Sequence, residues 1–484
     1  MSDNAQPLRR STNDSAARVP DGVWLGLLIA VVAVALGAAI GFAGPLLTVA
    51  AVLALGVAVI VVQRLDFALA ATLLVIMLLP YGSVPFKIVF TPTFLDLTIG
   101  AAVATYLLQW MTGRRRALTL TPAHLPLAFF AGLVGFAFVA GLPNGPLTPN
   151  LLRHFVELLM SIGLVAVLVD YFADTPRLTG LARVLMWGGA LAATIGIVLY
   201  VLPTELVNRI LSTLAPFGYP SGNVLRYVED DPSNYQRAIA TAIDPNALGG
   251  MLAMVGAFLA PQLVARKPIV GPRWLAVAMF ALVAACVVLT FSRGALGGLA
   301  VGLALIAALR YRKLLFVLGA GGVLLLYLPA AQGYVERFIA GVQGQDLATQ
   351  MRLGEYKDAL TLIGRYPIFG VGFSGTPTAD LYLGVSSAYL LMASQMGLTG
   401  IAAFVLLIGT VFVWALLRRK AVYGDAELTP IWLGALGALA AALSVGVVDH
   451  YFFNLEFQAA GALFWIVIAF GLAATRLAGE RATR

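Results

Sequence analysis

The chain has 484 residues, of which 60% are hydrophobic and 11% are charged, and its mean hydropathy is +0.91. A water-soluble domain of this length cannot bury so much apolar surface, so the composition excludes a soluble protein and requires lipid as the solvent. The formal net charge is +8. In a membrane protein the positions of the charges matter more than their sum, and we expect no nucleic-acid partner.

About fourteen apolar runs are long enough to cross a hydrocarbon core, two of them only just. The sequence therefore predicts an all-α, polytopic transmembrane bundle of about 12 to 14 helices, forming one integral membrane domain over residues 1–484. The short runs are 66–81 and 294–310. The others, in chain order, are 23–43, 45–62, 94–111, 124–142, 153–173, 179–201, 238–263, 275–291, 313–331, 385–417, 428–448 and 455–474.

Lysine and arginine residues cluster in alternate connections between these apolar runs. Basic clusters such as 114–116, 310–313 and 418–420 fall on the same side of the predicted membrane, which carries about two thirds of the 31 cations. The positive-inside rule makes that side cytoplasmic and places both termini there. We expect a multi-pass protein of the bacterial inner membrane. A long first apolar run with a second directly behind it argues against a cleaved signal peptide.

Two connections on the opposite, extracytoplasmic side are long, 202–236 and 332–384, whereas the cytoplasmic connections are short. Long connections usually carry function, so we expect the active site on the extracytoplasmic side. Tyr356, Leu360 and Ile363 have helical spacing, which predicts short interfacial helices in the second loop.

Several arginines lie at the extracytoplasmic ends of the apolar runs. They are Arg153, Arg237, Arg293, Arg352 and Arg365. Each can be neutralised by a nearby carboxylate such as Glu157, Asp244 or Glu355. Alternatively, several can share one anion, because a guanidinium group offers paired donors to phosphate oxygens.

Histidine and cysteine are too few and too scattered to form a metal site, and we expect no metal. His154 lies beside Arg153, and His450 lies beside Asp449, both pairs at the extracytoplasmic boundary. The glycines at 294, 297, 298 and 302 follow Arg293 in an apolar run and have no Walker lysine. They predict close helix packing, not a nucleotide-binding loop.

Four motifs follow one another over residues 225–475. The first is Arg237 with 243–247 (IDPNA), and the second is 290–294 (TFSRG). The third comprises Arg352, Tyr356, Ala359, Pro367, Gly370 and Gly372, and the fourth comprises Ser386, Ser387, Gly397 and Gly400. In this order the motifs resemble those of the bacterial O-antigen ligase and O-antigen polymerase family of membrane glycosyltransferases. The fourth motif has Ser386 where the family has a histidine.

The resemblance implies a metal-independent glycosyltransferase that needs no cofactor and uses a glycan on undecaprenyl pyrophosphate as its donor. By match to the family's arginines, Arg237, Arg293 and Arg352 would hold the pyrophosphate. Ser386 occupies the family's catalytic position but cannot act as the base, so we expect His450 or Asp449 to do so. The possible supporting residues are Arg153, His154, Asn246 and Tyr356.

Three functions remain open at this point. The first is a polymerase that joins repeat units of O antigen or another surface polysaccharide, possible partners being other polysaccharide assembly proteins. The second is a ligase that transfers finished glycan to a lipid A core or another acceptor. The third is a transporter or flippase of lipid-linked sugars, although transporters usually place ionisable residues near the bilayer midplane and show two related halves.

Overall fold

The computed structural model describes residues 64–313 without 88 and 116, residues 347–377 and residues 384–483, together with isolated positions elsewhere. The continuous ranges belong to one compact unit, Val61–Arg484. The predicted spans at 23–43, 45–62 and 313–331 lie outside the described residues.

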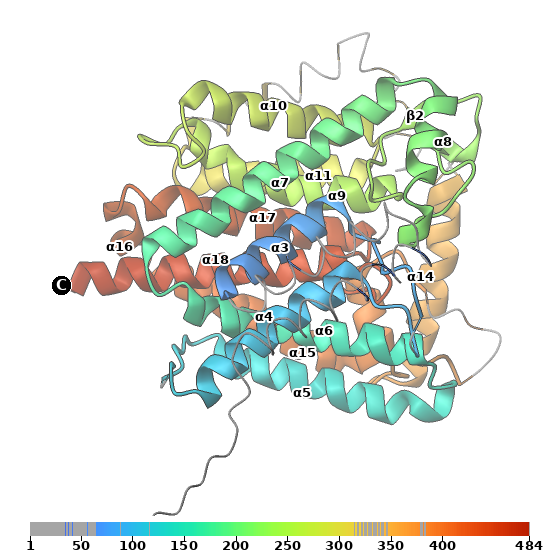
Figure 1. Ribbon diagram of the computed structural model, residues 1–484, viewed down its shortest axis with the longest axis horizontal. Coiled ribbons are helices and arrows are strands. Elements are labelled where there is room, and N and C mark those ends of the chain that lie inside the picture. The colour runs from blue at the N-terminus through green and yellow to red at the C-terminus, as the bar shows by residue number, and fades with distance from the viewer. Residues whose placement is uncertain are drawn as a thin grey trace, which may run out of the picture. The chain divides into compact units, whose positions relative to one another are not determined.

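Within the described ranges, every remaining predicted span contains a helix, which confirms the all-α polytopic fold (Figure 1), although the span 238–263 becomes helical only at Pro245. Eight of these helices are long and apolar enough to cross a membrane, and three apolar helices are shorter. The long helices are α4 (Phe94–Met111), α5 (His124–Gly141), α6 (Pro149–Tyr171), α7 (Thr175–Val201), α9 (Pro245–Leu259), α15 (Ala388–Leu417), α17 (Leu428–Val448) and α18 (Gln458–Thr483). The shorter ones are α3 (Leu65–Leu78), α10 (Arg273–Leu289) and α11 (Arg293–Leu309).

Polar side chains mark where several helices begin. Thr93 and Asp96 form a reciprocal capping box at the start of α4, Asp244 accepts from two backbone N–H groups of α9, and Ser292 caps α11. Such caps satisfy N–H groups that have no partner within the helix. They position Asn246 and Arg293 at helix starts.

Basic residues from several connections lie at one end of the helices, near α16 (Arg419–Gly424) and the C-terminus. Arg481 forms an ion pair with Asp425 at 2.5 Å and donates to Thr175 Oγ1, and Arg183 Nε donates to the Ile269 carbonyl at 2.8 Å. Figure 1 shows α16 and the C-terminus at this end, with α14 (Leu347–Arg365) and α8 (Thr204–Ser212) at the opposite end.

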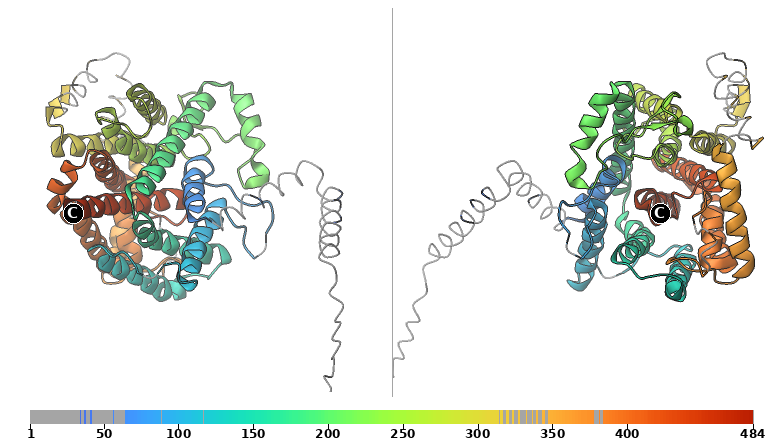
Figure 2. Two further views of the ribbon diagram at one scale, coloured as in Figure 1. Left: turned by 60° about the vertical axis from the view of Figure 1, so that its left-hand side comes forward. Right: turned by 90° about the vertical axis from the view of Figure 1, so that its right-hand side faces the viewer.

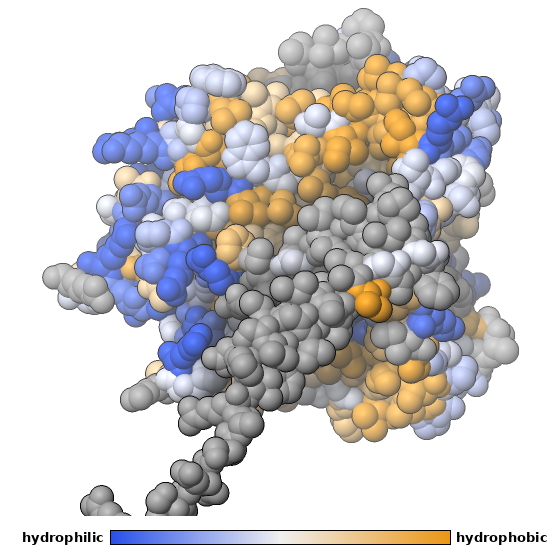
Figure 3. All heavy atoms as spheres, in the orientation of Figure 1, coloured by the Kyte–Doolittle hydropathy of each residue, from blue (hydrophilic) through white to orange (hydrophobic). Residues whose placement is uncertain are grey.

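Helix α18 is the most enclosed of the candidate spans, with 94% of its apolar window buried. Figure 2 shows it surrounded by other helices. The Trp432 indole on α17 donates to Thr475 Oγ1 on α18 at 3.0 Å. On the face drawn in Figure 3, hydrophilic residues gather at the end with α16, and hydrophobic residues cover surface away from it. Exposed apolar side chains of this kind match a lipid solvent.

Glycines bring α9, α11 and α17 close together. A Cβ atom added to Gly302 would lie 2.6 Å from the Gly437 carbonyl oxygen, and one added to Gly298 would lie 2.8 Å from the Ala441 oxygen. Only a residue without a side chain fits such an approach. Close helix packing therefore explains Gly298 and Gly302, as the sequence predicts, but not Gly297, where an added Cβ would meet nothing within 4 Å.

The two long connections contain regular structure. Residues 202–236 hold α8, the 3-10 turns η2 (Ala215–Phe217) and η3 (Val228–Asp230), and the strand β1 (Arg226–Tyr227), which pairs antiparallel with β2 (Gln236–Arg237). The second connection holds α14, whose 19 residues exceed the short helices expected there. Leu360 is 59% exposed, whereas Ala359 and Leu362 are buried, so the buried face is shifted by one position from the predicted one.

Candidate functional site

The first two motifs are joined through Arg237. Its Nε donates to the Thr290 carbonyl at 2.8 Å, and its Nη2 donates to Asn246 Oδ1 at 2.5 Å. The next residue extends the contact, because Ala238 N donates to the Leu289 carbonyl at 2.8 Å. Arg237 therefore holds the start of α9 against the junction between α10 and α11.

The third and fourth motifs are joined through their glycines. Gly372 N donates to the Gln395 carbonyl at 2.9 Å. Gly370, Gly372 and Gly397 have φ values of 66°, 82° and 69°, a left-handed conformation that favours glycine. Gly397 interrupts α15, and a Cβ added to Gly370 would lie 2.5 Å from the Ser394 oxygen. These glycines permit the close backbone packing at this junction.

A third set of contacts brings α14 to the ends of α15 and α17. The Tyr356 hydroxyl donates to the Ser386 carbonyl at 3.1 Å and lies 3.5 Å from the Val447 carbonyl. Ser386 N donates to the Glu355 carboxylate at 2.8 Å, and Ala388 N donates to the Asp449 carbonyl at 2.9 Å. The third and fourth motifs therefore meet at the segment that ends α17.

A cavity of about 480 Å³ lies where α11, α14 and α17 meet. Its charged side chains are those of Arg293 and Arg352, and Tyr356 also lines it. Arg352 makes no ion pair or hydrogen bond with any described residue. The remaining lining is small or apolar: Gly294, Gly297, Thr349, Leu353, Ser444, Val447 and Val448. Two guanidinium groups beside an apolar wall suit an anion attached to a hydrocarbon chain.

Asp449 lies next to this cavity, directly after Val448. Its side chain is 4% exposed, and a Cβ added to Gly294 would lie 3.5 Å from its Oδ2. Burial raises the pKa of Asp449 to about 7, although the charges of Arg352 and Arg237 oppose the shift. A carboxyl group with this pKa can accept a proton near neutral pH.

His450 is held by its Nδ1 atom, which donates to the Val385 carbonyl at 2.9 Å. The carbonyl can only accept, so the other ring nitrogen, Nε2, is left as an acceptor in the neutral ring. Burial lowers the pKa of His450, which favours that neutral form. The ring packs against Tyr451 and Phe457, with centroid distances of 5.1 and 5.5 Å.

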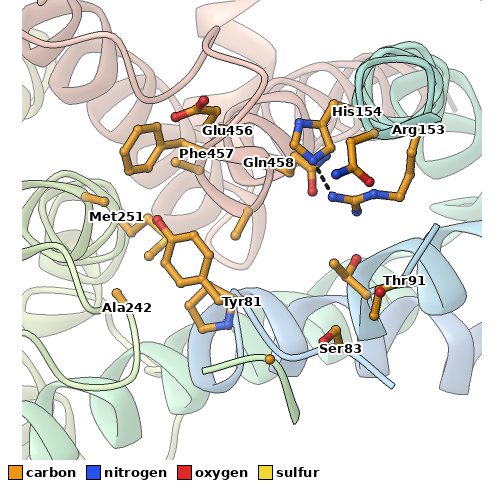
Figure 4. A pocket seen from close by; sticks show the side chains of 17 residues that line it. Tyr81, Ser83, Thr91, Arg153, His154, Ala242, Met251, Glu456, Phe457 and Gln458 are labelled. Carbon is orange, nitrogen blue, oxygen red and sulfur yellow. Dashed lines mark hydrogen bonds between the residues drawn. The ribbon is translucent and has the colours of Figure 1, made fainter. Parts of the chain in front are cut away.

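Arg153 and His154 line a different cavity, of about 370 Å³ (Figure 4). Arg153 forms ion pairs with Asp96 at 2.8 Å and with the fully buried Glu157 at 3.6 Å, and a further nitrogen donates to His154 Nε2. This arginine is neutralised by carboxylates, one of the two alternatives open from the sequence. The structure thus separates Arg153 and His154 from the eight other predicted site residues.

Three residues of the site were not predicted as functional. Glu355 holds the backbone of Ser386, Asp244 caps α9, and the buried Tyr451 contacts both Asn246 and Asp449. Glu355 follows Arg352 by three residues, a helical spacing that faces the same side. The DPN sequence predicts the Asp244 cap. No local pattern indicates Tyr451.

The fold and this site define a multi-pass membrane protein with an arginine-lined cavity beside a buried carboxyl group. Residues 277–405 match the family model described as O-antigen ligase, a segment that contains the second, third and fourth motifs. The match confirms the resemblance to the O-antigen ligase and polymerase family over this segment. No curated protein matches the chain. Arg237, Asn246, Asp449 and His450 lie outside the matched segment.

Proposed function

We propose that the protein is a glycosyltransferase of the bacterial inner membrane, with its active site facing the periplasm or cell exterior. Its donor is a glycan on undecaprenyl pyrophosphate. The observation that carries this proposal is the cavity shared by Arg293 and Arg352, within an O-antigen ligase-type segment. The uneven distribution of basic residues between the two helix ends supports the orientation.

The arginines bind the diphosphate and stabilise the charge that develops on it. As the bond from the anomeric carbon to the phosphate oxygen breaks, the negative charge moves onto undecaprenyl pyrophosphate, the leaving group. Arg293 and Arg352 contact the diphosphate directly. Arg237 does not line the cavity; it contributes its positive charge from outside the cavity and orients Asn246. Preformed donors of this kind need no rearrangement during the reaction.

The acceptor hydroxyl loses its proton as its oxygen bonds to the anomeric carbon. Asp449 is the preferred base because its pKa of about 7 lies near the working pH, and His450 Nε2 is the alternative. A general base contributes about 10² to 10⁴ in rate. Ser386 positions the site through its backbone, which Tyr356 and Glu355 hold.

The reaction we favour is polymerisation of repeat units of O antigen or another surface polysaccharide, because Ser386 replaces the family histidine. The alternative is a ligase that transfers finished glycan to a lipid A core or another acceptor, which the description of the matched family favours. The two differ in the acceptor and share the donor site.

The test is a transfer assay with purified protein in nanodiscs and lipid-linked oligosaccharide from the source bacterium. We expect longer lipid-linked glycans and release of undecaprenyl pyrophosphate, detected by mass spectrometry. A product on added lipid A core, with no chain extension, would identify a ligase. Movement of the lipid-linked sugar across the membrane without any new glycosidic bond would refute the proposal and favour a transporter.

A further inference from the structure

The second cavity has the lining expected of a saccharide site. Tyr81 and Phe457 present aromatic rings, and Asn150 and Gln458 present amide groups. Figure 4 shows the Tyr81 ring on one side of the cavity and Arg153 and His154 across from it. Sugar rings have apolar C–H faces that pack on aromatic rings and hydroxyl groups that exchange hydrogen bonds with amides.

The cavity offers polar atoms that the protein itself does not use. Gln458 Nε2 is buried without a close hydrogen-bond partner among the described residues, although the Gln458 side chain interacts with the Glu157 carboxylate. The Tyr81 hydroxyl has no hydrogen-bond partner among the described residues. His154 Nε2 accepts from Arg153, and a guanidinium group can only donate, so the proton of the neutral ring is on Nδ1. The cavity therefore presents several donors to a ligand.

The charge of the cavity disfavours a phosphate group. Its arginine, Arg153, is already paired with Asp96 and Glu157, and the lining adds a further carboxylate, Glu456. An anion would meet no uncompensated positive charge among the lining residues. A neutral, hydroxyl-rich ligand avoids this penalty.

The second cavity is connected to the proposed catalytic residues. Asn246 binds Arg237, and the next residue, Ala247, lines the second cavity. Phe457 also lines this cavity and packs against His450 and, with a centroid distance of 4.5 Å, against Tyr451. The arginine cavity and the second cavity are thus joined by the segment that carries Asp449 and His450.

We propose that the second cavity binds a neutral sugar residue of the acceptor glycan, beside the segment that carries Asp449 and His450. The inference rests on the proposed function, since it assigns the acceptor to one cavity and the diphosphate donor to the other. Tyr81, His154 and Gln458 are the residues that recognise the sugar.

Two probes separate this inference from the proposed function. The first is the repeat-unit oligosaccharide of the source bacterium, released from its carrier by mild acid and free of lipid and diphosphate. The second is undecaprenyl pyrophosphate without sugar. Binding of the first is measured by saturation-transfer NMR, and binding of the second by thermophoresis, both with the full chain in nanodiscs.

We expect Gln458→Leu and Tyr81→Phe each to weaken oligosaccharide binding about three- to tenfold, as loss of one or two neutral hydrogen bonds predicts, while undecaprenyl pyrophosphate binding stays within about twofold of wild type. Arg352→Ala should show the opposite pattern. Thr213→Val is the control, since Thr213 is exposed and lines neither cavity.

Unchanged oligosaccharide binding in both cavity variants, or none in the wild type, would overturn the saccharide site and leave the donor proposal intact. Weaker undecaprenyl pyrophosphate binding in Gln458→Leu and Tyr81→Phe would also overturn it, because the second cavity would then belong to the donor. No undecaprenyl pyrophosphate binding in the wild type would instead refute the proposed function. Size-exclusion profiles identify any variant that fails to fold.

Discussion

Replacing Arg352 with alanine tests the donor site most directly. Arg352 lines the 480 Å³ cavity and makes no ion pair or hydrogen bond with the described residues, so its removal breaks no polar contact within the described structure. A hydrogen bond to a charged group contributes about 1.5–3 kcal/mol. Since about 1.4 kcal/mol corresponds to a factor of ten, Arg352→Ala should raise the Kd for undecaprenyl pyrophosphate about 10- to 150-fold.

Two further variants make the result specific. Arg352→Lys keeps the charge but loses the paired donors, and we expect an intermediate Kd. Arg365→Ala removes the same charge from the other end of α14, where Arg365 is exposed and outside the cavity, and should bind as wild type does.

The assay is titration of each variant in nanodiscs with undecaprenyl pyrophosphate at constant ionic strength, with the melting temperature recorded in parallel. Equal affinity for wild type and Arg352→Ala would refute the assignment of Arg352. An equal loss in Arg352→Ala and Arg365→Ala would show that only general electrostatic attraction was at work.

The remaining predictions concern the base, the α14 contact and the glycines. Because the pKa of Asp449 is raised to about 7, its carboxylate form grows as pH rises from 6 to 8, and the transfer rate should rise with it. Asp449→Asn should lose about 10² to 10⁴ in rate and this pH dependence; a pH-rate profile unchanged by the substitution would exclude Asp449. Tyr356→Phe removes the hydrogen bond to the Ser386 carbonyl. Because a neutral hydrogen bond contributes about 1 kcal/mol, transfer should slow about fivefold while the melting temperature stays unchanged. Wild-type kinetics in this variant would show that the contact is dispensable. Gly397→Ala should lower the melting temperature, since its φ is 69° and its Cβ would collide with the Ile368 backbone, whereas Gly409→Ala, with open space, should not; equal melting curves would contradict that packing.

The sequence alone was enough to predict the membrane-spanning helices of the described ranges. Run length and apolar composition decide which segments can enter lipid, because every backbone group there must be bonded within its own helix. The predicted run 94–111 coincides with α4, and 428–448 coincides with α17. The motif residues at 237, 293 and 352 were also visible as arginines at the ends of apolar runs.

The partners of those arginines depended on the tertiary structure. Arg153 and Arg352 look equivalent in the sequence, yet Arg153 meets Asp96, 57 residues away on α4, while Arg352 faces a cavity. The approach of Asp449 to the start of α11 and the contact of Tyr451 with Asn246 likewise arise from packing between distant helices. Local patterns report which face of a helix is apolar, but only the three-dimensional arrangement of the helices decides which polar groups share a buried space, and with it which charges are neutralised.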